Sequence, residues 1–329
     1  MKTDGLPSQK LIFVLGKGGV GRSTVAAALA ELYSKRNETV LVVQWTVHDA
    51  VSPFFGAESS LSHTAREVFP GVSVMCFSPD EAIQEYFVDH LKMRLLYNVV
   101  VENKHVKKFI HAAPGVHELF FLGRLYWLVC LAQKERGWKY DRVIVDAPAM
   151  GHGVSLFRVA PTIAGLGMTG PLAVECERVS SLLFNEELVG SVVVTIPEEL
   201  PVEETIEFLP KITSELRRPP LCVVLNRSFM NNLSEQQVEA LAHRVSTEEA
   251  RHAVRLLATD LKKRESFAKM LQDVVDATNT PLLRALDAHV LDTAVTQQRV
   301  RAAVAEDLRR SFGEQGQGAQ QNKETGELS

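Results

Sequence analysis

A glycine-rich stretch near the start of the chain has residue types that bind phosphate. Gly16, Gly21 and Ser23 stand at the spacing of a G-x-x-x-x-G-K-[ST] loop, with Arg22 where lysine is usual. Glycines let backbone N–H groups approach phosphate oxygens, and a hydroxyl such as that of Ser23 can ligate Mg²⁺. The sequence therefore predicts a nucleotide phosphate site. Its consecutive residues are Gly16, Lys17, Gly18, Gly19, Val20, Gly21, Arg22, Ser23 and Thr24.

A second candidate site residue, Asp146, ends an apolar segment. Residues 140–146 predict a strand, and a carboxylate at the end of such a strand can hold Mg²⁺ through water. Ser23 and Asp146 are therefore the predicted metal ligands. Residues 147–153 follow, and the two glycines among them predict a loop that moves with the state of the nucleotide. His152 is interpreted as a positioned loop residue, with direct proton transfer as the alternative.

Two other polar residues follow predicted strands. Asp49 lies in the loop after residues 39–43, and two roles stay open for it: holding Mg²⁺ or orienting water, or capping a turn. Asn226 follows residues 221–225, where its amide would contact the edge of a base or make an Asx turn. Both residues are expected at the carboxyl edge of a parallel sheet, where ligands bind.

The surrounding sequence predicts alternating strands and helices. Short β-branched runs predict buried parallel strands, and capping signals at Ser78 and at residues 246–249 predict helix starts. Predicted strands cover 11–14, 39–43, 72–75, 140–146, 191–195, 221–225 and 281–283. Predicted helical segments cover 78–137 with a break at 113–115, 154–188, 202–216, 232–245, a long helix after 246, and 293–311. Residues 313–329, rich in Gly, Gln and Glu, predict a disordered tail.

Composition and charge exclude several classes of function. The 329 residues are 46% hydrophobic with a formal net charge of -4, so we expect a large core and no basic stripe for nucleic acid. No apolar stretch approaches the ~18 residues of a membrane span, and no secretory signal is recognisable. The 4 cysteines are far apart and predict reduced thiols. We therefore expect a cytoplasmic protein that is not integral to a membrane and binds no nucleic acid.

The glycine-rich loop and the segment after Asp146 carry a family resemblance. Residues 16–24, with the additional Lys17, resemble the deviant Walker A loop of the SIMIBI-class ATPases, which include ParA, MinD, the nitrogenase iron protein and the arsenite-pump ATPase. Residues 146–153 resemble the switch II signature of the ArsA family, which includes the ATPases that target tail-anchored proteins. Residues 195–205 are similar to the nucleotide-sensing segment of that family.

This resemblance extends from residue 11 to about residue 228 and implies a fold. It implies an α/β P-loop NTPase with a parallel, mostly doubly wound sheet and an inserted helical subdomain at about 78–137 and 154–188. One ATPase domain would then span residues 1–312, followed by the tail at 313–329.

The resemblance also implies roles for individual residues. Family members bind ATP and Mg²⁺ as dimers that close face to face. Lys17 would then reach the phosphates of the partner subunit, Ser23 would hold Mg²⁺, and Asp146 would be the Walker B acid. Asn226 would contact adenine. Closure driven by ATP would reshape an apolar surface, as in members that hold a protein or membrane-protein client.

Three positions depart from the family pattern. Arg22 replaces the usual phosphate lysine, Thr46 stands in place of the switch I aspartate that positions the attacking water, and Met150 replaces a switch II threonine. Loss of a water-positioning acid would cost roughly 10²- to 10⁴-fold in rate, so ATP binding should survive better than hydrolysis. Asp49 is the candidate to replace that acid, which makes Lys17, Asp49 and Asp146 the predicted catalytic residues.

Two hypotheses about function follow. The first is a Mg²⁺-dependent ATPase, as a homodimer or a heterodimer with an ArsA-like paralogue, that couples ATP binding and hydrolysis to handling of a client. The alternative is a weakly active or inactive pseudo-ATPase subunit that senses nucleotide and regulates an active paralogue. A positioning protein like MinD or ParA is disfavoured, because the sequence has neither an amphipathic membrane-binding end nor a basic DNA-binding face.

Overall fold

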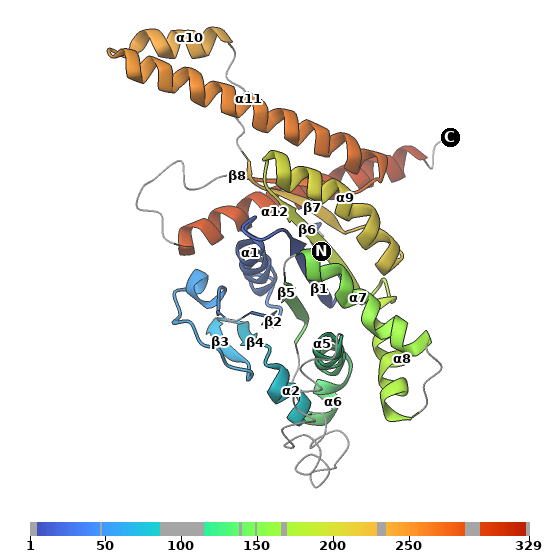
Figure 1. Ribbon diagram of the computed structural model, residues 1–329. Helices are drawn as coiled ribbons and strands as arrows, with labels where there is room; N and C mark the ends of the chain where they lie inside the picture. The colour runs from blue at the N-terminus through green and yellow to red at the C-terminus, as the bar shows by residue number, and fades with distance from the viewer. Residues whose placement is uncertain are drawn as a thin grey trace.

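The computed structural model describes residues 5–46, 48–85, 115–137, 140–148, 150–165, 170–228, 235–286 and 297–326 (Figure 1). These residues form an 8-stranded sheet with the order β3-β4-β2-β5-β1-β6-β7-β8. Each neighbouring pair is parallel except β3 with β4. The strands are β1 Leu11–Gly16, β2 Val40–Gln44, β3 Arg66–Phe69, β4 Val72–Cys76, β5 Arg142–Asp146, β6 Val189–Thr195, β7 Cys222–Ser228 and β8 Leu282–Leu286.

Helices alternate with these strands, as crossovers between parallel strands require. They are α1 Arg22–Ser34, η1 Ser52–Phe55, α2 Pro79–Glu85, α5 Val116–Tyr126, the π-helical turn η4 Trp127–Leu131, α6 Ala132–Arg136, α7 Met150–Gly165, α8 Pro171–Leu183, α9 Glu199–Leu216, α10 Glu235–Arg244, α11 Glu248–Ala277 and α12 Gln297–Gly326. The predicted α/β class with a parallel, doubly wound sheet is confirmed.

Strand β1 shows why helices cover both faces of the sheet. Its side chains alternate, so that Leu11, Phe13 and Leu15 belong to one core cluster while Ile12 and Val14 belong to another. The first cluster includes residues of α5, α7, α8, α9 and α11, and the second includes residues of α1, η1 and α12 (Figure 1). Because both faces are buried, the central strands are continuous apolar runs without alternation of polar residues.

Both predicted helix starts are capped, although the second uses Thr247, one residue after the Ser246 that begins the predicted capping box at 246–249. The Ser78 hydroxyl accepts a hydrogen bond from the Glu81 backbone N–H at 3.4 Å before α2. The Thr247 hydroxyl accepts one from the Ala250 N–H at 3.2 Å at the start of α11. Gly115 adopts a left-handed conformation with φ 86° before α5, which agrees with the predicted break at 113–115. The predicted continuation of α2 through residues 86–98, and the helical segment up to residue 114, lie outside the described residues.

Three elements differ from the sequence predictions. Strand β3 was not predicted, because its short antiparallel segment at the sheet edge has no continuous apolar run. Helix α7 begins at Met150, so the predicted loop over Met150–Gly153 is wrong. Its two glycines cost only about 1 kcal/mol each in helix propensity, and packing of Phe157 on Phe13, with ring centroids 5.0 Å apart, outweighs that cost. Helix α12 continues to Gly326 where a disordered tail was predicted, although residues 313–326 include four glycines, which have low helix propensity.

A buried ion pair fixes α12 to the first helix of the sheet. The Arg301 guanidinium donates a hydrogen bond of 2.8 Å to the Glu31 carboxylate on α1 and another of 2.8 Å to the Phe54 carbonyl of η1. It also lies over the rings of Phe55 and Phe69, at 4.5 Å and 5.2 Å from their centroids. Arg301 therefore joins α12, α1 and the segment that follows β2.

We expect Arg301→Ala to lower the free energy of unfolding by about 2–3 kcal/mol, because a buried carboxylate and a buried carbonyl each lose a partner. Lys35, whose ammonium lies 2.9 Å from Glu31, keeps part of the charge compensation. The measurement is a urea denaturation midpoint, with Arg309→Ala as the control on the exposed side of the same helix. Equal midpoints for the two variants would contradict the prediction.

Candidate nucleotide-binding site

The sheet topology brings the predicted site residues to one edge. Strand β1 pairs with β5 and with β6, and β5 also pairs with β2. In this register Gln44 lies opposite Asp146, and Gly16 lies opposite Val194. The glycine-rich loop, the loop after β2, and Asp146 therefore lie together at the carboxyl edge, which is the ligand-binding edge of such sheets.

The glycine-rich loop has the geometry of an anion cradle. A Cβ atom at Gly16 would lie 2.4 Å from the Val194 carbonyl oxygen, so glycine is required there for close packing. Gly21 has φ 93° and is the N-cap of α1, without a side-chain cap hydrogen bond and without an acidic residue in the first turn. Cβ atoms at Gly18 and Gly19 would meet nothing within 4 Å. The start of α1 thus has no side-chain cap and follows a loop with open space around Gly18 and Gly19, a combination that suits a bound phosphate.

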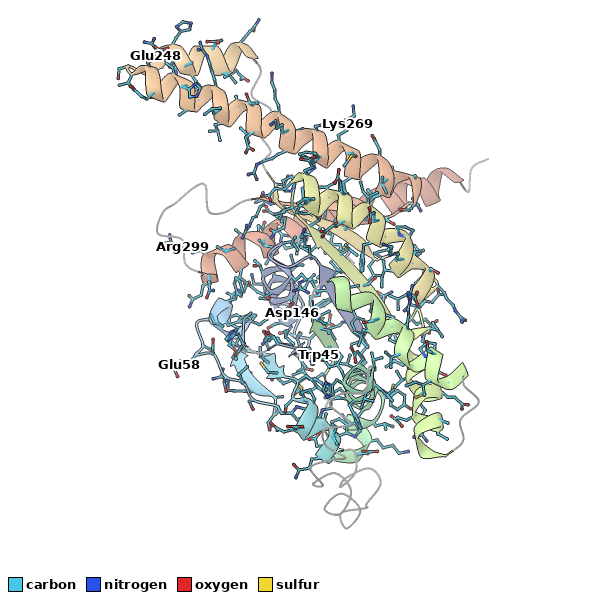
Figure 2. The ribbon with its side chains drawn as sticks, viewed as in Figure 1. Trp45, Glu58, Asp146, Glu248, Lys269 and Arg299 are labelled. Atoms are coloured by element: carbon cyan, nitrogen blue, oxygen red, sulfur yellow. The ribbon has the colours of Figure 1, made fainter. Side chains whose placement is uncertain are left out.

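The two predicted metal ligands, Ser23 and Asp146, are in direct contact. The Ser23 hydroxyl donates a hydrogen bond of 2.6 Å to the Asp146 carboxylate. Asp146 is buried at the end of β5 (Figure 2). Burial raises the pKa of Asp146, while the Ser23 hydrogen bond and the charge of Arg22 act in the opposite direction. A hydroxyl and a carboxylate beside a phosphate cradle are oxygen donors of the kind that Mg²⁺ uses with substrate phosphates. This donor set fits the ion.

Arg22 extends from the glycine-rich loop to the segment after Asp146. Its guanidinium donates a hydrogen bond of 2.5 Å to the Ala147 carbonyl. Burial lowers the pKa of Arg22, and the Asp146 carboxylate acts in the opposite direction. The cation therefore connects the phosphate loop to the first residue after β5.

We expect Arg22→Lys to tighten ATP binding by up to about tenfold. The lysine side chain would lose the hydrogen bond that Arg22 donates to the Ala147 carbonyl, so its ammonium could contact a phosphate, and a single such contact is worth about 1.4 kcal/mol. Titration with a fluorescent ATP analogue measures this, and Arg22→Gln, which lacks the charge, is the matched control that should bind more weakly. Weaker binding by Arg22→Lys than by the wild type would show instead that the guanidinium itself is required for phosphate.

Lys17 is paired within its own chain. Its ammonium lies 2.6 Å from the carboxylate of Glu204 on α9, and both side chains are partly exposed. An exposed pair of this kind contributes at most about 1 kcal/mol, so it holds Lys17 only weakly. Glu204 is a residue whose contact the sequence did not predict. Its position near a helix start gave no sign that α9 brings it to the phosphate loop.

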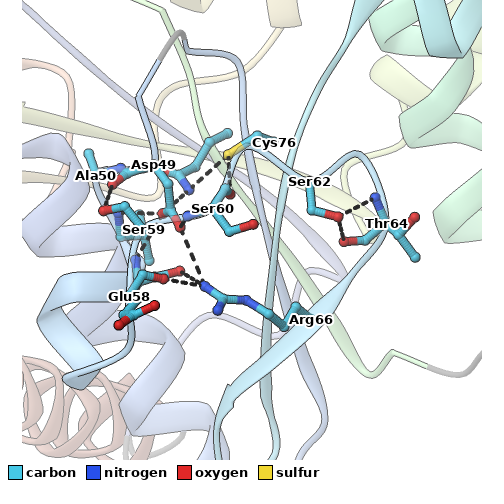
Figure 3. A network of polar contacts seen from close by, with 12 residues as sticks. Asp49, Ala50, Glu58, Ser59, Ser60, Ser62, Thr64, Arg66 and Cys76 are labelled. Carbon is cyan, nitrogen blue, oxygen red and sulfur yellow. Dashed lines mark hydrogen bonds and ion pairs between the residues drawn. The ribbon is translucent and has the colours of Figure 1, made fainter.

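Asp49 organises the loop after β2 (Figure 3). Its carboxylate accepts hydrogen bonds from the Gln44 amide at 2.8 Å, and from the backbone N–H groups of Ser52 and Ser60 at 3.0 Å each. These hydrogen bonds lower the pKa of Asp49 despite the opposing effect of burial. Arg66 lies 3.9 Å from the same carboxylate. These contacts favour the turn-capping interpretation of Asp49, and its role towards water stays a prediction.

The thiol of Cys76 belongs to the same network. It lies 3.6 Å from the Gln44 amide nitrogen and 3.7 Å from the Ser60 carbonyl (Figure 3). Burial, together with the nearby Asp49 charge, raises its pKa to about 12. The neutral thiol therefore has a packing role. Gln44, which joins Cys76 to Asp49, was not singled out from the sequence, although its place at the end of a predicted strand is the signal that could have found it.

Asn226 contacts the phosphate loop. It is buried, and its amide donates a hydrogen bond of 2.9 Å to the Val20 carbonyl. A Cβ atom at Gly21 would lie 2.2 Å from the same amide nitrogen, so the glycine makes room for it. The structure thus places Asn226 beside the loop, in a contact that neither sequence interpretation described. The side chains of residues 150–154, including Met150 and His152, lie outside the described part of the chain.

A parallel sheet with a glycine-rich loop between β1 and α1, and a carboxylate at the end of β5, defines a P-loop nucleoside triphosphatase fold. Residues 9–172 match the model of the family described as anion-transporting ATPase. The chain belongs to this family, the ArsA family of ATPases.

Relatives across much of the chain also bear the name ATPase. ATPase BagA of Mycobacterium tuberculosis is 26% identical over 299 residues, which cover 87% of this chain and 85% of that protein. An ATPase ASNA1 homolog of Dictyostelium discoideum is 23% identical over 242 residues, 72% of this chain and 68% of the relative. ATPase GET3 of Mycosarcoma maydis is 37% identical over 143 residues, 44% of this chain and 40% of the relative. Among the described helices, none combines the length and apolarity needed to cross a membrane.

Proposed function

We propose that the chain is a cytoplasmic Mg²⁺-dependent ATPase that binds ATP at the interface of a dimer and couples its nucleotide state to a protein or membrane-protein client. The observation that carries the proposal is the contact of Ser23 with Asp146 beneath the uncapped start of α1. Residues 16–24 would hold the phosphates of ATP through backbone N–H groups. Ser23 and Asp146 would hold Mg²⁺, which when bound neutralises phosphate charge.

The dimer and the client rest on the family. Lys17 is the residue through which a partner subunit would complete each site, and its weak pairing with Glu204 leaves it available for that role. The partner is a second copy of this chain or an ArsA-like paralogue. Asn226 lies against the loop, where it would support the adenine-binding side of the site.

The test is to measure ATP binding, ATP hydrolysis and subunit mass on the same purified sample, with and without Mg²⁺. We expect Mg²⁺-dependent turnover and a shift to the mass of a dimer in the presence of ATP. ATP binding without turnover, restored by adding a paralogue, would overturn the active-enzyme form in favour of the regulatory pseudo-ATPase. Failure to bind ATP would overturn the proposal altogether.

A further inference from the structure

The loop after β2 lies at the metal end of the nucleotide site. In the sheet order β2-β5-β1-β6-β7, the glycine-rich loop follows the central strand β1. On one side of it β5 ends in Asp146, and on the other side β7 carries Asn226, whose amide contacts this loop. Because Mg²⁺ bridges the β- and γ-phosphates of a nucleotide, the γ-phosphate belongs on the side of β5. The next strand on that side is β2.

The side chain of Gln44 ties this loop to the end of β2. Gln44 is fully buried and lies opposite Asp146 in the strand register. Its amide nitrogen donates a hydrogen bond of 2.8 Å to the Asp49 carboxylate, and its amide oxygen accepts one of 2.9 Å from the Ala50 backbone N–H. The chain therefore leaves β2 after Gln44 and is bonded to the same side chain again five residues further on.

Asp49 is held by the rest of the loop as well (Figure 3). Its carboxylate accepts hydrogen bonds from the backbone N–H groups of Ser52 and Ser60 at 3.0 Å each, and the Ser59 hydroxyl donates one of 3.0 Å to its backbone carbonyl. The contacts with Gln44, Ser52 and Ser60 use both carboxylate oxygens. Asp49 thus anchors the loop, and this anchor fixes the position of the residues that directly follow β2.

Thr46 lies between the two ends of this closed segment and has a hydroxyl proton that can bind a ligand. Its hydroxyl oxygen accepts a hydrogen bond of 3.2 Å from the His48 backbone N–H, and the residue is partly buried. A hydroxyl carries one donor besides its acceptor lone pairs, and within the described part of the chain no acceptor takes the donor of Thr46. Phosphate oxygens are charged acceptors, with which a hydroxyl forms its stronger hydrogen bonds.

We propose that the Thr46 hydroxyl contacts the γ-phosphate of ATP, and that Gln44 is the positioning residue that holds Thr46 in place. Thr46 comes two residues after Gln44, just past the strand end that stands opposite Asp146. It therefore belongs to the end of the site where Mg²⁺ and the γ-phosphate meet. Such a contact distinguishes ATP from ADP, because ADP has no γ-phosphate. This inference rests on the ATP binding of the proposed function.

The test measures the dissociation constants of a non-hydrolysable ATP analogue and of ADP, each with Mg²⁺. Thr46→Val keeps the shape of the side chain and removes the hydroxyl. We expect it to raise the dissociation constant of the analogue about tenfold, because one hydrogen bond to a charged oxygen is lost, and to leave that of ADP unchanged. Thr46→Ser, which keeps a hydroxyl, should recover most of the affinity for the analogue.

Gln44→Leu tests the positioning role, because it removes both contacts that close the loop. We expect the same selective loss of affinity for the analogue, and a urea midpoint checks the fold. Adding Thr46→Val to Gln44→Leu should cause no larger loss than Thr46→Val alone, since both changes remove one contact. Ser59→Ala is the matched control. It removes a hydrogen bond to Asp49 in the same network without touching Gln44, and it should bind both nucleotides as the wild type does.

Two results would overturn the γ-phosphate contact. One is an equal loss of affinity for the analogue and for ADP in Thr46→Val, and the other is no loss for either. In both cases the wild type still binds nucleotide, so the proposed function survives the failure of this inference. A wild type that binds neither nucleotide would overturn the two together.

Discussion

Asp146→Asn is expected to lower the rate of ATP hydrolysis by about 10²- to 10³-fold while ATP still binds. The carboxylate is buried and contacts Ser23 at 2.6 Å, so the pair supplies the charged oxygen and the hydroxyl for Mg²⁺. Asparagine keeps the shape and an oxygen but removes the negative charge that favours the metal. Backbone N–H groups of residues 16–24 would still hold the phosphates. Steady-state kinetics across a Mg²⁺ titration, beside ATP binding, measures both effects.

The same substitution should make the protein more resistant to urea at neutral pH. Burial raises the pKa of Asp146 above its ordinary value of 3.8, so the native state binds the proton more tightly than the unfolded state does. The free energy of unfolding therefore falls as pH rises from 3.8 through the raised native pKa. Above the native pKa the buried carboxylate is charged and destabilises the native state. Asparagine carries no such cost. The stability difference between variant and wild type should vanish in acid, below the ordinary carboxyl pKa.

Asp49→Asn is the matched control for Asp146. Its carboxylate accepts hydrogen bonds from Gln44, Ser52 and Ser60, and its pKa is lowered, so its charge stabilises the fold above the ordinary carboxyl pKa. We expect this variant to be less stable than the wild type, which is the opposite direction from Asp146→Asn. A loss of turnover in Asp49→Asn as large as in Asp146→Asn, with stability unchanged, would instead support the predicted role of Asp49 towards water.

Much of the fold followed from local patterns in the sequence. Strands β1, β2, β5 and β6 are buried on both faces of the sheet. A continuous apolar run is the pattern of such a strand, so these segments could be predicted as strands of a parallel sheet from their sequence. The helix-start signals at Ser78 and at residues 246–249 were also local, and the structure moves the second cap by one residue, to Thr247. In contrast, α7 begins earlier than its glycines suggested, because its packing on β1 depends on contacts far apart in the chain.

In the candidate site, too, some features could be predicted from local sequence and others could not. The spacing of Gly16, Gly21 and Ser23, and the position of Asp146 at the end of a strand, placed them correctly at one edge of the sheet. The contacts of Arg22 with Ala147 and of Lys17 with Glu204 join residues 125 and 187 positions apart. No local pattern predicts such pairs, since they follow from strand order and helix position.

Mixing two inactive variants, Lys17→Ala and Asp146→Asn, is expected to restore ATP hydrolysis. Each variant alone should be slower by about 10²-fold or more, because one loses a phosphate-stabilising cation and the other the Mg²⁺ carboxylate. If Lys17 acts across the dimer, each mixed dimer contains one complete site, formed by Asp146 of one chain and Lys17 of the other. Random pairing in an equal mixture then gives about a quarter of the wild-type rate.

The contact of Lys17 with Glu204 makes this experiment decisive about where the lysine acts. The Lys17 ammonium lies 2.6 Å from Glu204 of the same chain, and Lys17 belongs to the same phosphate loop as Ser23. The direct alternative is therefore that Lys17 acts in the nucleotide site of its own chain. A lysine that acts in its own chain leaves every site in the mixture defective, and the mixture stays inactive. Glu204→Gln, which frees Lys17 but keeps both chains otherwise intact, is the control. We expect it to hydrolyse ATP at least as fast as the wild type, since the lost pair contributes at most about 1 kcal/mol and releases the lysine for the partner.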